Sequence, residues 1–222
     1  MTGLHVEVQA GTEPALVWGH ALLQSISTGP IDPRTLDLAN EIVTYDARNH
    51  GSSPDAVASD QLNWKALAND LLAVADATGH ERFVAGGISM GAATALVAAC
   101  AAPDRVLGLV LAIPPAAWTI RWGQRVFYAS VGSLGAFVPV DGVRRASRSL
   151  RGAARSDLPS LDELAGLEIP TLVLCWHLDP SHPHSVAKKI AETIPDADLV
   201  TSNRPGDAGG WNERVEAFLR EL

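Results

Sequence analysis

The feature that most constrains the fold of this chain is a glycine-rich turn at residues 86–91, Gly-Gly-Ile-Ser-Met-Gly. The turn follows an apolar, strand-like run and opens an alanine-rich stretch that is typical of a helix. Small residues at Gly87 and Gly91 allow a strand to turn sharply into a helix, which holds the intervening serine above the sheet in a strained backbone conformation. This context predicts a nucleophile elbow with Ser89 at its tip. The alternative is a tight strand-to-helix connection without chemistry.

Strand-like and helix-like runs alternate along the chain, which predicts an α/β fold. Residues 4–8 alternate apolar and polar side chains, as an edge strand does. Continuous apolar runs, typical of buried parallel strands, occur at residues 15–18, 42–45, 83–85, 107–112, 171–175 and 199–201. Helix-like runs occupy residues 62–78, 92–102, 185–193 and 211–222. Short links between them predict a mostly parallel central sheet flanked by helices, with ligands at the carboxyl ends of the strands.

Residues 114–165 interrupt this alternation, because they contain two helix-like stretches and no strand. We interpret them as a short helical cap over the site. The cap is inserted into a single domain of residues 1–222, whose 47% hydrophobic content suffices for one core. Four aromatic residues of the insert are expected to line an apolar pocket that faces the serine, or else to pack within the core or the cap: Trp118, Trp122, Phe127 and Tyr128.

The formal net charge of −8 argues against a nucleic-acid partner, because an acidic surface repels phosphate backbones. One cluster of basic residues has near-helical spacing and is interpreted as a solvated helix face: Arg144, Arg145, Arg148, Arg151 and Arg155.

Both cysteines, Cys100 and Cys175, have apolar neighbours in the sequence and are expected to be buried free thiols in a reducing compartment. The first residues lack the basic and apolar regions of a secretory leader, and glycine and proline break the longest apolar stretch, residues 106–118. We therefore expect a cytoplasmic protein without a membrane partner.

Four further motifs follow one another along the chain. They are Val-Trp-Gly-His-Ala at residues 17–21, Tyr-Asp-Ala-Arg-Asn-His-Gly-Ser-Ser at 45–53, Asn-Asp-Leu-Leu at 69–72, and the acid-bearing segment at 170–183. With the turn at residues 86–91, their order and spacing resemble the α/β-hydrolase fold family along nearly the whole chain. The resemblance implies the fold of that family, and the short N-terminus predicts that the first of its usual eight strands is missing.

The resemblance also implies roles for single residues. Asp179 matches the family's acid, which orients a catalytic histidine and stabilises its charged form. The alternative for Asp179 is a helix N-cap or an Asx turn, favoured by the following Pro180. By position, the backbone amides of Leu22 and Met90 would form the oxyanion hole.

Other motif residues are interpreted as structural. Ala21 and Asn49 replace glycines of the family, and Asn is the residue that best tolerates the left-handed region after glycine. Four side chains are expected to hold loops through hydrogen bonds: His20, His50, Asp46 and Arg48. We expect His5 and His80 at the surface.

One residue that the family requires is absent. Its catalytic histidine should follow the last strand, within residues 201–211, but no histidine occurs after His184. A serine without an adjacent base is a poor nucleophile, and loss of the base typically lowers turnover about 10⁶-fold. His182 is the best candidate for the base, because its loop should neighbour the loop where the base belongs. The alternative is that His182 is structural or exposed.

Three histidines flank the acid, and with it they are chemically able to bind a metal: His177, Asp179, His182 and His184. Because this short segment matches no common zinc spacing, we expect no metal and no cofactor.

The sequence thus predicts an esterase-like serine hydrolase of a small ester or related carbonyl substrate, with Ser89 as nucleophile, Asp179 as acid and His182 as base. Two alternatives stay open. One is a catalytically impaired member that binds a small apolar ligand between cap and sheet, and the other is a scaffold that binds a partner through the cap arginines. Neither the substrate nor the oligomeric state follows from the sequence.

Overall fold

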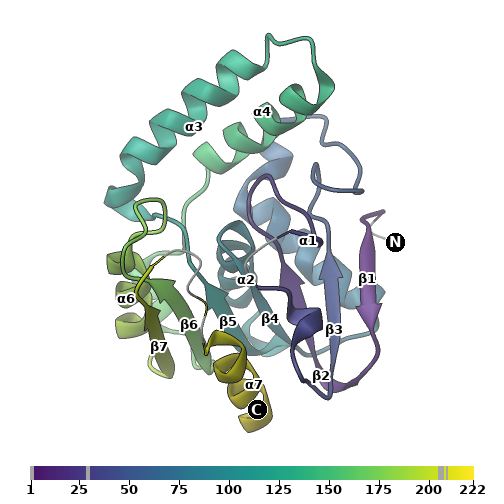
Figure 1. Ribbon diagram of the computed structural model, residues 1–222, viewed down its shortest axis with the longest axis vertical. Coiled ribbons are helices and arrows are strands. Elements are labelled where there is room, and N and C mark those ends of the chain that lie inside the picture. Colours follow the sequence, from purple (N-terminus) through teal and green to yellow (C-terminus); the bar gives the residue numbers. More distant parts are fainter. Residues whose placement is uncertain (1–2, 29–30, 205–207, 209) are drawn as a thin grey trace.

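The computed structural model describes residues 3–28, 31–204, 208 and 210–222. Within these residues one sheet of seven strands has the order β1-β3-β2-β4-β5-β6-β7 (Figure 1). Strand β1 is antiparallel to β3, and all other neighbours are parallel. The strands are β1 (Val6–Gln9), β2 (Thr12–Gly19), β3 (Asn40–Tyr45), β4 (Phe83–Ile88), β5 (Val106–Ala112), β6 (Thr171–Trp176) and β7 (Ala197–Ser202). The predicted mostly parallel sheet is confirmed, with the alternating segment at its antiparallel edge.

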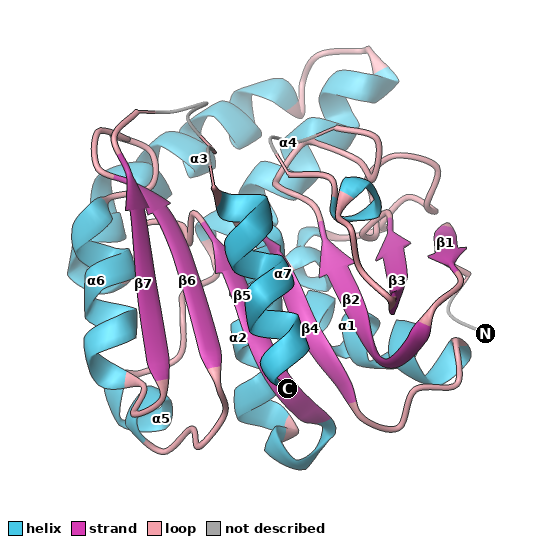
Figure 2. Cartoon of the chain, turned by 60° about the horizontal axis from the view of Figure 1, so that its bottom comes forward, coloured by secondary structure: helices cyan, strands magenta, loops and turns pink. Residues whose placement is uncertain are grey.

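Helices cover both faces of the sheet. Helices α1, α2 and α6 pack on one face and α7 packs on the other, which Figure 2 shows from the side of α7. The helices are α1 (Trp64–Ala77), α2 (Met90–Ala101), α3 (Trp122–Gly135), α4 (Asp141–Ala154), α5 (Leu161–Ala165), α6 (His184–Thr193) and α7 (Trp211–Glu221). The predicted helices are confirmed, although α2 begins two residues earlier than expected.

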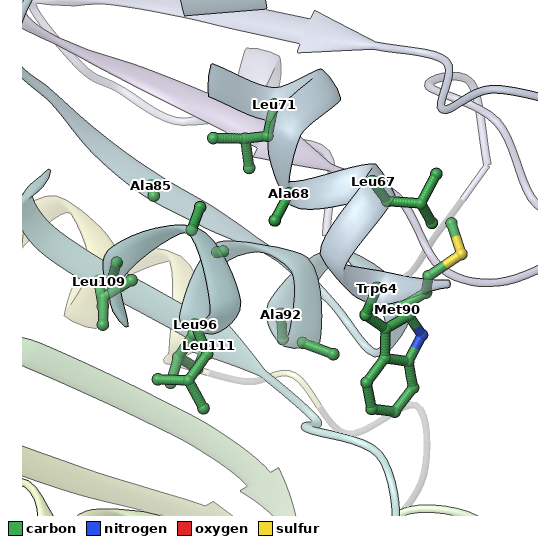
Figure 3. Packing of buried hydrophobic residues seen from close by; sticks show 14 of the residues in the cluster. Trp64, Leu67, Ala68, Leu71, Ala85, Met90, Ala92, Leu96, Leu109 and Leu111 are labelled. Carbon is green, nitrogen blue, oxygen red and sulfur yellow. The ribbon is translucent and has the colours of Figure 1, made fainter. Parts of the chain in front are cut away.

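Side chains of the central strands alternate between two buried clusters. Val17 joins the cluster under α1 and α2, whereas its neighbours Leu16 and Trp18 join the cluster under α7. Figure 3 shows the first cluster, in which Leu71 of α1 and Leu96 of α2 pack over the strands. Because both faces are covered, the central strands β4 and β5 carry no polar side chain along their length, as the sequence indicated.

The insert between β5 and β6 is helical. It comprises a 3-10 turn at Trp118–Arg121 and the helices α3, α4 and α5. Helices α3 and α4 lie at the end of the molecule to which the parallel strands point, with α3 outermost (Figures 1 and 2). A Cβ atom on Gly152 of α4 would overlap Leu62, so α4 packs its backbone directly against the segment before α1. None of the described helices is both long and apolar enough to cross a bilayer.

Candidate active site

Ser89 lies at the turn from β4 into α2, where the sequence predicted an elbow. Its φ and ψ are 53° and −105°, a conformation that is rare for any residue except glycine. A Cβ atom on Gly91 would overlap the carbonyl oxygen of Gly19, and one on Gly87 would lie 2.6 Å from the same oxygen. The glycines are therefore required because the end of β2 packs directly against the turn. The predicted strain at Ser89 is confirmed.

The Ser89 hydroxyl is hydrogen bonded to a histidine. Its Oγ lies 2.9 Å from Nε2 of His182, and Nδ1 of His182 lies 2.8 Å from Oδ2 of Asp179. A carboxylate can only accept, so Nδ1 carries the proton and Nε2 is free to accept from the serine. The structure thus brings Ser89, His182 and Asp179 into one hydrogen-bonded chain.

The position of His182 follows from the pairing of the last two strands. Trp176, the last residue of β6, is opposite Ser202 of β7. Beyond the strands, the amide of His177 donates to Ser202 O at 2.8 Å and that of Leu178 donates to Asn203 O at 3.3 Å. The loop after β6 therefore runs beside the loop after β7, as predicted. Four residues of the latter, Pro205, Gly206, Asp207 and Gly209, lie outside the described residues.

Asp179 has two tasks at once. Its Oδ1 accepts from the amide of Ser181 at 2.8 Å and from the amide of His182 at 3.2 Å, which forms an Asx turn. Its Oδ2 holds the imidazole of His182. The Asx turn and the contact to the histidine, which were alternatives from the sequence, coexist. The turn orients the ring toward Ser89, and His182 keeps 21% of its side chain exposed.

The candidate oxyanion-hole amides flank the elbow. Met90 is the first residue of α2, and Leu22 lies just beyond the end of β2, which packs against the elbow. Within the described part of the chain, neither amide donates a hydrogen bond to a protein acceptor. Both are thus available to a ligand. That they face a common cavity with Ser89 stays a prediction.

Two buried histidines hold the neighbouring loops. His20 accepts from the amide of Ala47 through Nε2 at 2.9 Å and donates through Nδ1 to Ala21 O at 2.7 Å. His50 donates through Nδ1 to Arg48 O at 2.9 Å. Burial lowers the pKa of both rings, that of His50 to about 4, so both are neutral. The prediction that they are structural is confirmed.

The other motif residues are structural as well. Asp46 accepts from the amides of Ile26 and Ser52 at 2.9 and 2.7 Å. Burial raises the pKa of Asp46, but these hydrogen bonds, together with His20 and His5, outweigh it and the net shift is downward. Arg48 forms a bidentate ion pair with Asp70 of α1, in which Nε donates to Oδ2 at 3.0 Å and NH2 donates to Oδ1 at 2.5 Å. Asn49 has a φ of 67°, in agreement with its predicted tolerance of the left-handed region.

Two of the arginines predicted to be solvated instead bind the loop after β3. Nε of Arg145 lies 2.8 Å from Oδ1 of Asp55, and NH2 of Arg148 lies 2.7 Å from Oδ2 of the same residue. Arg145 also donates to four carbonyl oxygens, those of Asn49, His50, Gly51 and Ser53. The prediction of a solvated face is wrong for these two residues, because helical spacing does not reveal which side of α4 meets the core.

The insert also touches the histidine loop. Nε2 of Gln124, in the first turn of α3, donates to the carbonyl oxygen of Ser181 at 3.2 Å. Ser181 immediately precedes His182. This contact could not be predicted from the sequence, because a lone glutamine in an apolar helix carries no recognisable pattern.

The expectation for the insert's aromatic residues is wrong for two of them. Trp122 and Phe127 are 71% and 61% exposed, so they do not line an enclosed pocket. Trp118 instead packs against the buried cluster under α1 and α2, and its indole N–H donates to Pro159 O within the insert at 3.0 Å. A cavity of about 530 Å³ lies between α1, the end of α2 and residues 155–163, and Ser89 is not among its lining residues.

Two further predictions concern isolated side chains. His80 is 6% exposed and bonds Glu13 and Glu41, each at 2.8 Å, so the prediction of a surface position is wrong. Both cysteines are free, as predicted, and burial raises the pKa of Cys100 to about 12, which keeps this thiol protonated.

The remaining two histidines of the loop after β6 contact each other. The rings of His177 and His184 are 5.0 Å apart, and Nε2 of His184 lies 3.2 Å from Oγ1 of Thr201. Within the described ranges, no group of three or more His, Cys, Asp or Glu side chains could hold a metal ion.

Comparisons with known proteins agree with this architecture. A family model described as alpha/beta hydrolase fold matches residues 32–151. Among solved structures, the alpha/beta hydrolase MGS-M2 from a Medee basin deep-sea metagenome superposes with a TM-score of 0.84 at 16% identity, covering 99% of this chain and 94% of its own. The enol-lactonase of Burkholderia xenovorans gives 0.77 at 20% identity, covering 98% and 96%. A thermophilic esterase of Thermogutta terrifontis gives 0.78 at 22% identity, covering 98% and 92%.

Proposed function

The chain belongs to the α/β-hydrolase fold family, and from this premise we propose that it is a serine hydrolase of an ester or a related carbonyl substrate. The observation that carries the proposal is the chain of hydrogen bonds from Ser89 through His182 to Asp179, at 2.9 and 2.8 Å. His182 would thus serve as the base in place of the histidine that is absent after the last strand. A nucleophile, a base and an orienting acid in this order make a serine reactive, wherever the three lie in the sequence.

In the first half of the reaction, Ser89 Oγ attacks the substrate carbonyl carbon while His182 Nε2 takes the hydroxyl proton. The oxygen of the tetrahedral intermediate accepts hydrogen bonds from the amides of Leu22 and Met90, and one such donor lowers the barrier by about 3 kcal/mol. Asp179 stabilises the imidazolium through Nδ1. His182 then returns the proton to the leaving alcohol, and the acyl group remains bound to Ser89.

In the second half, water replaces the alcohol. His182 takes a proton from the water as its oxygen attacks the acyl carbonyl carbon. Collapse of this intermediate breaks the bond to Oγ, and the proton on His182 returns to Ser89. The products are a carboxylic acid and the free enzyme. The similar folds of an esterase and an enol-lactonase support esters and lactones as the first substrates to assay.

A fluorophosphonate probe tests the proposal, because it labels only an activated serine. We expect rapid labelling of the wild type, none at position 89 in Ser89→Ala, and strongly slowed labelling in His182→Ala. His184→Ala is the matched control, because this histidine contacts Thr201 and His177 and should leave the labelling rate unchanged. Labelling of Ser89 that does not depend on His182 would refute the assignment of the base.

The same experiment separates the enzyme from a silent ligand-binding member of the family. Thermal stabilisation by a small apolar ester without any labelling of Ser89 would favour the binder. A scaffold that uses the cap arginines has less support, because Arg145 and Arg148 are engaged with Asp55.

A further inference from the structure

The outer surface of the insert is apolar and uncovered. Among the described residues, ten of the fifteen exposed large hydrophobic side chains lie between Ile120 and Val143. We define the apolar face by the most prominent of them, which come from α3 and from its connection to α4: Trp122, Phe127, Leu134, Phe137 and Val140, exposed by 71%, 61%, 72%, 85% and 55%. Uncovered apolar side chains in such number are typical of an interaction surface.

No charge interrupts this surface on α3. Arg125 is the only charged residue of the helix. It is turned toward the core, where NH2 donates to Ser156 O at 3.2 Å and NH1 lies 3.7 Å from Asp157. Figure 1 shows α3 as the outermost element at this end of the molecule, so the apolar face meets solvent rather than the sheet.

The part of the insert that carries α3 and α4 is basic although the chain is acidic. Residues 118–155 hold seven of the 17 basic residues and one of the 25 acidic ones. Arg144 donates to Val138 O at 3.1 Å, and the side chain of Arg151 packs beside Gly132 of α3. Neither arginine forms an ion pair with a carboxylate in the described part of the chain. Arg144 therefore places an uncompensated positive charge beside the apolar face, whereas Arg151 lies where α3 and α4 pack together.

We propose that the apolar face docks onto the surface of an anionic lipid bilayer. Trp122, Phe127 and Phe137 enter the interfacial region, where aromatic side chains are favoured, and Arg144 approaches the anionic headgroups. A second copy of the chain fits the face less well, because a symmetric contact would bring the arginines of both copies together. The negative charge of the rest of the chain keeps the other surfaces away from the bilayer and so fixes the orientation.

This docking departs from the sequence expectation of no membrane partner. That expectation considered leaders and spanning helices, whereas a helix that lies on a bilayer needs neither. Docking would also bring the lipid to the end of the molecule where Gln124 of α3 contacts the loop of His182. The proposal does not depend on the hydrolase activity, and its test measures binding only.

Flotation with vesicles of phosphatidylcholine, with and without phosphatidylglycerol, tests the docking. We expect the wild type to float with the mixed vesicles at low salt and much less with pure phosphatidylcholine. The triple variant Trp122→Ser, Phe127→Ser and Leu134→Ser should bind at least about tenfold more weakly, because it loses the inserted side chains. Arg144→Gln should weaken binding to mixed vesicles about fivefold and reduce its salt dependence.

Matched controls lie on other surfaces. Val8→Ser removes a half-exposed valine from the edge strand β1, and Arg220→Gln removes an exposed arginine from α7. Both should bind like the wild type. A second measurement places the contact directly, because lipids brominated near the headgroup should quench the fluorescence of Trp122, and this quenching should be absent in Trp122→Phe.

Absence of wild-type flotation, or equal binding by the wild type and the triple variant, would overturn the proposal. So would a dimer in analytical ultracentrifugation that the triple variant dissociates while vesicles fail to bind, because the occupant would then be a second copy. All replaced side chains are exposed or carry no ion pair, so we expect every variant to fold. Thermal unfolding should give melting temperatures close to that of the wild type.

Discussion

The elbow and the loop that carries His182 meet at one hydrogen bond, but they are held in different ways. The elbow is fixed by backbone packing, because Gly91 and Gly87 touch the carbonyl of Gly19 across the sheet. The loop is fixed by side chains, mainly Asp179, which holds both the turn and the ring of His182. A change in the elbow should therefore disturb the whole fold, whereas a change in the loop should disturb only the chemistry.

The sharpest test of this difference is His182→Ala. Because Ser89 and His182 act as one proton-transfer unit, the variant should lose about 10⁴- to 10⁶-fold in ester turnover, nearly as much as Ser89→Ala. The double variant should lose no more than either single one. The melting temperature should change little, because the ring is partly exposed. A loss of turnover below about tenfold, or 1.4 kcal/mol in the barrier, would show that His182 is structural.

Gly91→Ala should disrupt the backbone packing of the elbow and so destabilise the fold. The added methyl group overlaps the Gly19 carbonyl, so β2 and α2 must separate, and we expect a loss of at least about 3 kcal/mol in the free energy of unfolding. Denaturant titration measures it. Gly123→Ala is the matched control, because nothing lies within 4 Å of its added methyl group. Equal stability of the two variants would contradict the packing account of the elbow.

Lowering the pH should destabilise the folded protein through His50, which is buried beside the site. In the folded protein the pKa of His50 is lowered to about 4 from the ordinary 6.5, so between these values only the unfolded chain takes up the proton. Stability should thus fall as the pH falls from about 6.5 to 4, by about 2 to 3 kcal/mol for this residue. Urea titrations at several pH values should show a flatter dependence in His50→Gln. The exposed His177, replaced by Gln, should keep the wild-type slope.

The smallest effect is expected at the contact between the insert and the histidine loop. Gln124→Ala removes the hydrogen bond to Ser181 O, and a loss of about 1 kcal/mol in loop ordering should lower turnover about fivefold. The stability should be unchanged. Ser133→Ala, an exposed position on the same helix, is the control. If both variants keep full turnover, the insert does not position His182.

Much of the fold could be predicted from single segments. The turn at residues 86–91 predicted the elbow, because only glycine on either side of the serine allows the backbone to approach Gly19 so closely. The serine between the two glycines has the expected strained conformation. The continuous apolar strands indicated a sheet covered on both faces. Asn49, as a residue that tolerates positive φ, was also recognisable from its type alone.

Other features escaped prediction because they depend on what lies opposite. The spacing of Arg145 and Arg148 is that of a solvated helix face, yet Asp55 meets them from a distant loop. His80 has no local sign of burial, but Glu13 of β2 and Glu41 of β3 both contact its ring. Trp122 and Phe127 are residue types that are usually buried, yet they face solvent.

The sequence by itself determined the class of sheet, the position of Ser89 and the lack of a histidine after His184, because backbone preference and periodicity are properties of consecutive residues. Only the tertiary structure decided that His182 lies within hydrogen-bond reach of Ser89. That outcome depends on the parallel pairing of β6 with β7, which brings two loops together, and on the turn at Asp179, which points the ring across the gap. Contacts between segments far apart in the chain have no counterpart in local pattern, so the base could be nominated from the sequence but not placed.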